Sequence, residues 1–327
     1  MIINLSFLNA TNGMFWYSVD KIKTIDYDKH IILCSKHVDK ILREQMPDSN
    51  IKTVSKFGAV AIIIYNYLFF NGSFKLITFT SHPLPFLSNQ TIAFYDTYPF
   101  LGKLGLLKKM LFKIAVNTSK CRIGIINRSL SVPFLNQCGV KSDKIFFDSA
   151  FPTVKMSKLK SRSTTPRTPL QVGLVGTDSS KKNYDTIFNA VLELSAQEKV
   201  EFIIYGTNND YYRRLCVDYK NIKISLISSD NIEILDYFYQ IDYLISAAKD
   251  EGYGRPMGLA AVVGVPMMLL KSDVFMEFFG ETATFFDEVS DIVAFIVNHR
   301  PPAFVRPRAV EHFRGDESAF FSSDYFG

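Results

Sequence analysis

The chain has 327 residues, of which 47% are hydrophobic and 21% charged, so it can bury a large core and is not intrinsically disordered. Its length suits two domains of about 150 residues better than one. The formal net charge of +5 is unevenly spread: residues 1–150 hold 18 Lys and Arg against 9 Asp and Glu, whereas residues 171–327 hold 14 against 23. This division predicts different partners for the two halves, with an anionic surface facing the basic first half.

The sequence shows no pattern of a disulfide framework, a signal peptide or a membrane span. The four cysteines are scattered, as in proteins kept reduced in the cytosol. The first residues, Met1–Asn4, contain no basic group, and the longest apolar run, Ala59–Phe70, is shorter than the roughly 20 residues that cross a bilayer. We therefore expect a cytoplasmic protein that is at most peripheral on the cytoplasmic face of the membrane.

The first half alternates between apolar, β-rich runs and mixed segments that favour helices. The expected strands are 1–8, 30–34, 74–80, 91–95, 122–126 and 144–147, and the expected helices are 38–45, 104–116 and 132–138. Such alternation predicts a parallel sheet covered by helices. Residues 1–152 are therefore expected to form one Rossmann-like α/β domain.

A polar, basic and proline-containing segment, 153–169, is the predicted linker. The alternation restarts after it, with expected strands at 170–175, 200–205, 222–226, 243–246 and 266–270 and expected helices at 185–197, 232–239 and 258–263. Residues 170–303 should form a second Rossmann-like domain. We expect the tail, 304–327, to pack back on the first domain.

The most informative segment lies between the expected strand that ends at Ser246 and the next strand. It places an acid, Glu251, before two glycines that flank an aromatic residue, and Pro256 then suits the first turn of a helix. Glycines allow backbone N–H groups to approach a ligand, and a helix N-terminus attracts an anion. In a doubly wound sheet such a loop follows the carboxyl end of a strand, where ligands bind.

This segment resembles the donor-site motif of the family 4-like, retaining glycosyltransferases, which runs E-G-F-G-x-P, then x-x-E-A-M-A, then x-G-x-P-V. The matching residues are Glu251, Gly252, Tyr253 in place of Phe, Gly254, Pro256, Ala260, Gly264, Val265 and Pro266. Upstream, Gly173–Tyr184 resembles the glycine and lysine segment of the same family. The resemblance covers about residues 170–285 and implies the GT-B architecture, in which two Rossmann-like domains face each other across a cleft. The first domain would bind the acceptor and the second the nucleotide-sugar donor.

The resemblance also implies roles for individual residues. Lys182, the Gly176 loop and the helix start would stabilise the negative charge that builds on the departing phosphate, while Glu251 would hold the donor sugar's hydroxyl groups. The donor-binding residues expected are Gly176, Thr177, Lys182, Gly206, Glu251, Gly252, Tyr253, Gly254, Arg255 and Pro256. Because protein cations neutralise the phosphate, we expect no metal and no cofactor beyond the nucleotide-sugar co-substrate.

Two positions depart from the family pattern. Leu259 stands where the family has a ribose-binding glutamate, and Thr177 stands where it often has an arginine near the diphosphate. These departures leave open an atypical donor or a decayed donor site.

Three places in the first half could meet the acceptor. Asn12 and Gly13 follow the first expected strand, His82 ends the strand at 74–80, and Asp96 ends the strand at 91–95. His82 could assist proton transfer, and Asp96 is the candidate base should the reaction invert the anomeric carbon. The alternatives are a plain turn at Asn12 and Gly13, a capped surface histidine at His82, and a helix or turn cap at Asp96.

The segment 100–122 is rich in leucine and lysine. It is either a core-facing helix or a helix that lies on an anionic membrane, in which case a lipid-linked acceptor follows. The expected function is therefore sugar transfer to a glycan or lipid-linked acceptor in the synthesis of surface polysaccharide or lipopolysaccharide.

Three alternatives remain open at this stage. Asp26-Tyr27-Asp28 fits the metal-binding motif of a GT-A enzyme. The basic first half could bind DNA, as in DNA-base glucosyltransferases, but lysine dominates over arginine there, which argues against a nucleic acid partner. The third alternative is a non-catalytic protein with a decayed donor site.

Overall fold

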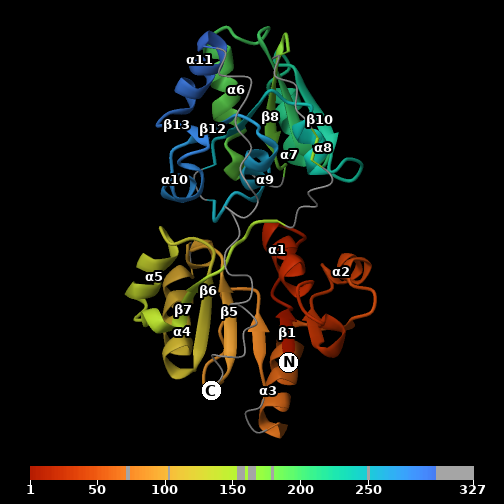
Figure 1. Ribbon diagram of the computed structural model, residues 1–327, viewed down its shortest axis with the longest axis vertical. Coiled ribbons are helices and arrows are strands. Elements are labelled where there is room, and N and C mark those ends of the chain that lie inside the picture. Colours follow the sequence, from red (N-terminus) through yellow and green to blue (C-terminus); the bar gives the residue numbers. More distant parts are fainter. Residues whose placement is uncertain are drawn as a thin grey trace. The chain divides into compact units, whose positions relative to one another are not determined.

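The computed structural model describes residues 1–70, 74–101, 104–152, 159–160, 167–177, 180–248 and 251–299. These residues form two compact units, one up to residue 152 and one from residue 159 (Figure 1). The predicted tail, 304–327, and most of the predicted linker, 153–169, lie outside the described residues. Each unit is a parallel sheet covered by helices, so the expectation of two Rossmann-like α/β domains is confirmed.

The first unit has a seven-stranded sheet with the strand order β3-β2-β1-β4-β5-β6-β7. Its strands are β1 (Ile2–Leu5), β2 (Ile31–Cys34), β3 (Asn50–Thr53), β4 (Leu76–Thr78), β5 (Gln90–Phe94), β6 (Cys121–Ile125) and β7 (Ile145–Phe147). Its helices are α1 (Gly13–Ile22), α2 (Asp39–Gln45), α3 (Lys56–Phe69), α4 (Gly105–Thr118) and α5 (Ser131–Gln137). The strand order reverses between β1 and β4, which makes this the topological switch point of the sheet.

The second unit has a six-stranded sheet with the strand order β10-β9-β8-β11-β12-β13. Its strands are β8 (Leu170–Val175), β9 (Val200–Gly206), β10 (Ile224–Ser228), β11 (Tyr243–Ser246), β12 (Met267–Leu270) and β13 (Ala283–Phe286). Its helices are α6 (Tyr184–Glu193), α7 (Asp210–Asp218), α8 (Ile234–Phe238), α9 (Arg255–Val263), α10 (Asp273–Phe279) and α11 (Val289–His299). Here the order reverses between β8 and β11.

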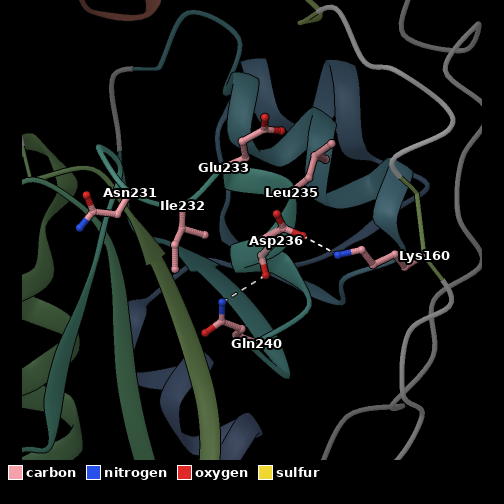
Figure 2. A pocket seen from close by; sticks show the side chains of 7 residues that line it. All are labelled: Lys160, Asn231, Ile232, Glu233, Leu235, Asp236 and Gln240. Carbon is pink, nitrogen blue, oxygen red and sulfur yellow. Dashed lines mark hydrogen bonds and ion pairs between the residues drawn. The ribbon is translucent and has the colours of Figure 1, made fainter.

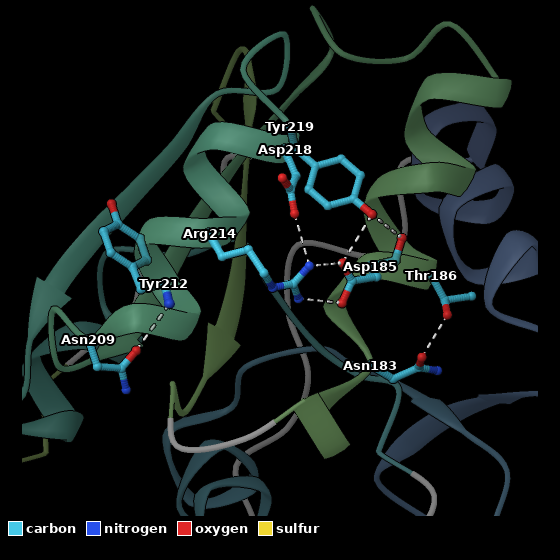
Figure 3. Close-up of polar contacts among 8 residues, drawn as sticks. All are labelled: Asn183, Asp185, Thr186, Asn209, Tyr212, Arg214, Asp218 and Tyr219. Carbon is cyan, nitrogen blue, oxygen red and sulfur yellow. Dashed lines mark hydrogen bonds and ion pairs between the residues drawn. The ribbon is translucent and has the colours of Figure 1, made fainter.

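A polar network joins α6 to α7 beside the end of β8 (Figure 3). The guanidinium of Arg214 lies 2.9 Å from the Asp185 carboxylate and 3.0 Å from that of Asp218, and the Tyr219 hydroxyl donates to Asp185 over 3.2 Å. The hydrogen bond from Arg214 holds the pKa of Asp185 below its usual value. The network fixes the first turn of α6, and the residue that precedes this helix, Asn183, directly follows Lys182.

Candidate functional site

The donor-side candidates gather around the switch point of the second sheet. Gly176 and Thr177 follow β8, and Glu251–Gly254 lie between β11 and α9. β8 and β11 are neighbours in the sheet, and the chain leaves them in opposite directions, towards β9 and towards β12. The loops after these two strands therefore border the usual ligand position of such a sheet.

Lys182 and Glu251 meet across this switch point. The Lys182 Nζ atom lies 2.8 Å from Glu251 Oε1, and the two side chains are 22% and 24% exposed. Lys182 belongs to a short 3-10 turn, Ser180–Lys182, and the next helix is anchored where the Tyr184 hydroxyl donates to the Gly176 carbonyl over 2.8 Å. A cation and a carboxylate 69 residues apart in sequence are thus paired within reach of solvent.

Two glycines at the switch point, Gly254 before α9 and Gly176 after β8, have backbone conformations that require glycine. Gly254 caps α9 with φ of +80°, and a Cβ atom there would approach the Phe275 ring to 2.9 Å. Gly176 has φ of +99°. Both backbone conformations are ones that other residues rarely adopt. The conformation of Gly254 allows α9 to begin at Arg255, with Pro256 in its first turn, at the end of the loop.

The Tyr253 side chain is buried in the protein and packs against α10. It is 2% exposed, and its ring centroid lies 4.6 Å from that of Phe278 and 6.1 Å from that of Phe279. The ring therefore anchors the glycine loop to the end of α10. Contact between this residue and a ligand would have to come from its backbone.

Thr177 and Gly206 interlock at the ends of β8 and β9. Thr177 is 3% exposed, and its hydroxyl donates to the Thr207 carbonyl and accepts from the Thr207 N–H, both over 2.9 Å. A Cβ atom at Gly206 would come within 2.7 Å of that hydroxyl. Leu259, the other departure from the family pattern, is 7% exposed. Both departures are therefore buried side chains, and the positive charge near the loop comes from Lys182 and Arg255.

The acceptor-side candidates lie at the carboxyl ends of β1, β4 and β5, which are adjacent in the first sheet. The Asn12 side chain caps α1 by accepting from the N–H groups of Met14 and Phe15, over 3.1 and 3.3 Å. A Cβ atom at Gly13 would lie 3.7 Å from the Tyr95 hydroxyl, and Asp96 follows Tyr95. The structure thus brings Asn12, Gly13 and the end of β5 together.

His82 follows β4 at the same edge. Its ring stacks on Phe7 with the centroids 4.7 Å apart, and Nδ1 lies 3.1 Å from the Thr80 hydroxyl. His82 is nevertheless exposed to solvent. The partial burial of its ring, followed by the charges of Lys56 and Lys108, lowers the pKa of His82 below its usual value. A lowered pKa favours the neutral imidazole at pH 7, which has one N–H donor and one acceptor nitrogen.

We expect the imidazole of His82 to titrate clearly below its ordinary value of about 6.5. The measurement is an NMR titration, with the His82 signal assigned by its loss in His82→Asn. Lys56→Gln removes one of the two cations, so it should raise the midpoint. A midpoint between about 6 and 7 in the unmodified protein would contradict the arrangement.

No family model matches the chain. The chain is 25% identical over 302 residues to the O-antigen chain mannosyltransferase RfbU of Salmonella typhimurium LT2, covering 85% of this chain and 84% of the relative. The structure of HepE from Anabaena in complex with UDP and glucose superposes with a TM-score of 0.69 at 14% identity, covering 98% of this chain and 95% of that one. The glycosyltransferase WaaG, involved in lipopolysaccharide biosynthesis, has a TM-score of 0.66 at 11% identity, covering 92% and 91%.

This chain is a glycosyltransferase of the GT-B fold. The GT-A alternative is wrong, because the glycosyltransferase has two Rossmann-like units. Asp26 of the suspected metal motif instead pairs with Lys29 over 2.7 Å. Among the residues that the structure describes, no cluster of three or more His, Cys, Asp or Glu side chains could hold a metal ion. Within the same residues, no helix is long and apolar enough to span a bilayer.

The sequence did not point to a buried polar group in the first unit of the glycosyltransferase. Asp148 follows β7 and is fully buried, with the Lys21 Nζ atom 2.5 Å from Oδ1 and the Tyr17 hydroxyl donating to Oδ2. Tyr17 and Lys21 lie on α1, 127 and more residues away in sequence. An acid at the end of a strand gives no signal of which cation it will meet.

A hollow of about 510 Å³ lies against α8 (Figure 2). Its lining residues are Lys160, Asn231, Ile232, Glu233, Leu235, Asp236 and Gln240. None of them belongs to the switch-point loops, and Lys160 is engaged with Asp236 over 2.7 Å. We therefore place the candidate donor site of the glycosyltransferase at the switch point and not in this hollow.

Proposed function

We propose that the enzyme transfers a sugar from a nucleotide-sugar donor to a glycan or lipid-linked acceptor in the synthesis of surface polysaccharide or lipopolysaccharide, with retention at the anomeric carbon. The relative RfbU is named as an O-antigen chain mannosyltransferase, and WaaG as an enzyme of lipopolysaccharide biosynthesis. HepE was crystallised with UDP-glucose. These names support the reaction class and the acceptor class proposed for this chain.

The observation that carries the proposal is the Lys182–Glu251 pair at the switch point, 2.8 Å apart. A donor phosphate that enters the site offers Lys182 a stronger anionic partner, because a phosphate carries more charge than one carboxylate. Glu251 is then released from Lys182 and can accept hydrogen bonds from the donor sugar's hydroxyl groups. Each half of the pair would thus bind a different half of the donor.

The remaining donor-side residues have two kinds of role in this proposal. Gly176, Gly252 and Gly254 bring backbone close to the donor, and Arg255 and Pro256 begin the helix whose positive end faces the phosphate. The buried residues Thr177, Gly206 and Tyr253 hold the loops in place. Because these groups supply the positive charge, the proposal includes no metal and no cofactor besides the donor.

We assign the acceptor to residues 1–152 and the donor to residues 170–303. Asn12 and Gly13 would border the acceptor, and neutral His82 would accept a proton from its hydroxyl group. Asp96 remains the candidate base should the reaction invert. We assign no protein nucleophile, and we place the enzyme in the cytoplasm because nucleotide-sugar donors are the substrates proposed.

Calorimetry with a panel of nucleoside diphosphates and their sugar conjugates tests this proposal. One donor class should bind, and at 100 times its dissociation constant it should stabilise the protein by about 2.7 kcal/mol. Glu251→Gln should weaken binding of the sugar nucleotide while leaving binding of the matching nucleoside diphosphate nearly unchanged. If no member of the panel binds, the decayed donor site becomes the better interpretation.

A further inference from the structure

Helices α3 and α4 of the first unit expose an unusual amount of apolar side chain. Phe57 on α3 is 89% exposed and Leu106 on α4 is 87% exposed. The other large apolar side chains exposed at these two helices or next to them are Ile64, Tyr65, Leu68, Phe69, Phe70, Leu101, Leu104, Leu107, Met110, Leu111 and Ile114. Single exposed leucines are ordinary in soluble proteins, but large groups of them mark interaction sites. We call this set of residues the α3–α4 surface.

The exposure follows the helical repeat. On α3, Phe57, Ile64 and Leu68 are spaced by seven and then four residues, so they form one outward stripe. On α4, Leu107, Met110, Leu111 and Ile114 form a second outward stripe. The core-facing residues are separate, since Ile63 of α3 and Phe112 of α4 are buried. Each helix therefore has two apolar sides, and within the described part of the chain only one of them packs in the core.

The two helices cover the same face of the sheet. Ile63 packs in one cluster with Leu76 of β4, and Phe112 packs in another with Ile92 of β5. Thr78 is paired in register with Ile92 and lies two residues after Leu76, so Leu76 and Ile92 point to one face. Because β4 and β5 are neighbours, the unused sides of α3 and α4 look away from the sheet in the same direction.

The charge around this surface has one sign. Residues 49–142, which include both helices, contain 11 Lys and Arg and a single acid, Asp96. Lys56 begins α3, and Lys108 and Lys113 are exposed on α4 among the apolar residues. Two copies of such a surface would repel each other, and nucleic acid phosphates offer nothing to Phe57 or Leu106. An anionic bilayer satisfies both features, because its headgroups attract lysine and its acyl boundary accepts apolar side chains.

We propose that the α3–α4 surface docks on an anionic lipid bilayer, with the apolar stripes at the acyl boundary and the lysines among the headgroups. Lys56 and Lys108 are also the cations that act on His82, so the docked surface borders the acceptor-side edge of the first sheet. An acceptor with a lipid tail would then reach that edge without leaving the membrane. The docking itself needs neither donor nor acceptor and can be tested apart from the proposed reaction.

Vesicle co-sedimentation of the full chain tests the proposal, with vesicles of phosphatidylcholine alone and vesicles with about one third phosphatidylglycerol. Binding should be confined to the anionic vesicles and should weaken as salt is added. Lys108→Glu with Lys113→Glu should lower the binding constant by about thirtyfold or more. Phe57→Ser with Leu106→Ser should lower it by about tenfold or more. These four side chains are exposed, so the variants should keep the circular dichroism of the native protein.

Matched controls lie in the second unit. Val217→Ser removes an apolar side chain that is 73% exposed on α7, and Lys199→Glu with Lys220→Glu changes the net charge by the same amount as the lysine pair on α4. Both controls should bind vesicles as the native protein does. Equal binding by controls and surface variants would overturn the proposal. So would a soluble dimer that Phe57→Ser with Leu106→Ser dissociates and that does not bind vesicles.

Discussion

Replacing Lys182 with alanine should lower the rate of sugar transfer by about 10²–10³-fold, the usual cost of removing one group that stabilises charge developing in a transition state. Lys182 is placed for this role by its turn after β8 and by Glu251, whose carboxylate lies 2.8 Å away before any donor enters. The loss should appear mainly in kcat, because the charge on the leaving phosphate grows as the glycosidic bond breaks. Steady-state kinetics with the donor found by calorimetry measures it.

The neighbouring lysine supplies the control. Lys181 belongs to the same turn but is exposed, so Lys181→Ala removes an equal charge and should change the rate by less than about threefold. If the two alanine variants lose equal activity, a general loss of positive charge explains the effect. If Lys182→Ala keeps full activity, the site assignment is wrong.

The elements that the sequence predicted most accurately are the two strands that border the candidate donor site. Leu170–Val175 and Tyr243–Ser246 were expected with the bounds that β8 and β11 have. Both strands are largely buried in a parallel sheet, and such strands give continuous apolar runs that no amphipathic helix imitates. The loop after β11 could also be predicted, because glycines and a proline mark both its turn and the start of α9.

The elements that were missed lack a clean alternation of apolar and polar residues. β3 (Asn50–Thr53) has only one buried residue, Ile51, and so no strand pattern. Asn12 and Gly13 predicted a turn, although Asn12 is the cap of α1. α3 lies in the longest apolar run, where its outward stripe hides the helical period. The same apolar stripe that obscured the helix is the observation behind the proposed bilayer contact.

Roles that depend on distant residues could not be predicted. The buried ring of Tyr253 depends on Phe278 of α10, and the buried hydroxyl of Thr177 depends on Thr207 after β9. A sequence motif fixes the backbone that approaches a ligand more firmly than it fixes which side chains touch it. The structure therefore divides the expected donor residues into those that face solvent, such as Lys182 and Glu251, and those that hold the loops.

Lys21→Met should cost the first unit about 3–5 kcal/mol of folding free energy, the usual effect of removing one partner from a buried ion pair. The Lys21 side chain is 7% exposed and that of Asp148 is fully buried, so methionine would leave the carboxylate beside Tyr17 with no ammonium group 2.5 Å away. Urea unfolding followed by circular dichroism measures the change. Because the chain has two units, the loss should appear in one of two transitions and not in both.

Lys23→Met is the matched control. Lys23 is the exposed residue that caps the C-terminus of α1, and its ammonium group donates to the Gln45 side chain over 2.7 Å at the surface. It should change stability by less than about 0.5 kcal/mol. Lys21→Met combined with Asp148→Leu should recover most of the loss, because two apolar side chains leave no buried charge. An equal cost for Lys21→Met and Lys23→Met would show that the pair does not secure α1. Recovery in the double variant would show that the cost of Lys21→Met comes from the unpaired, buried Asp148 carboxylate. Tyr17, which donates to that carboxylate, also packs on Tyr95 with ring centroids 5.4 Å apart, so the single variant should also disturb the place where Asn12 and Gly13 meet the end of β5, beside Asp96.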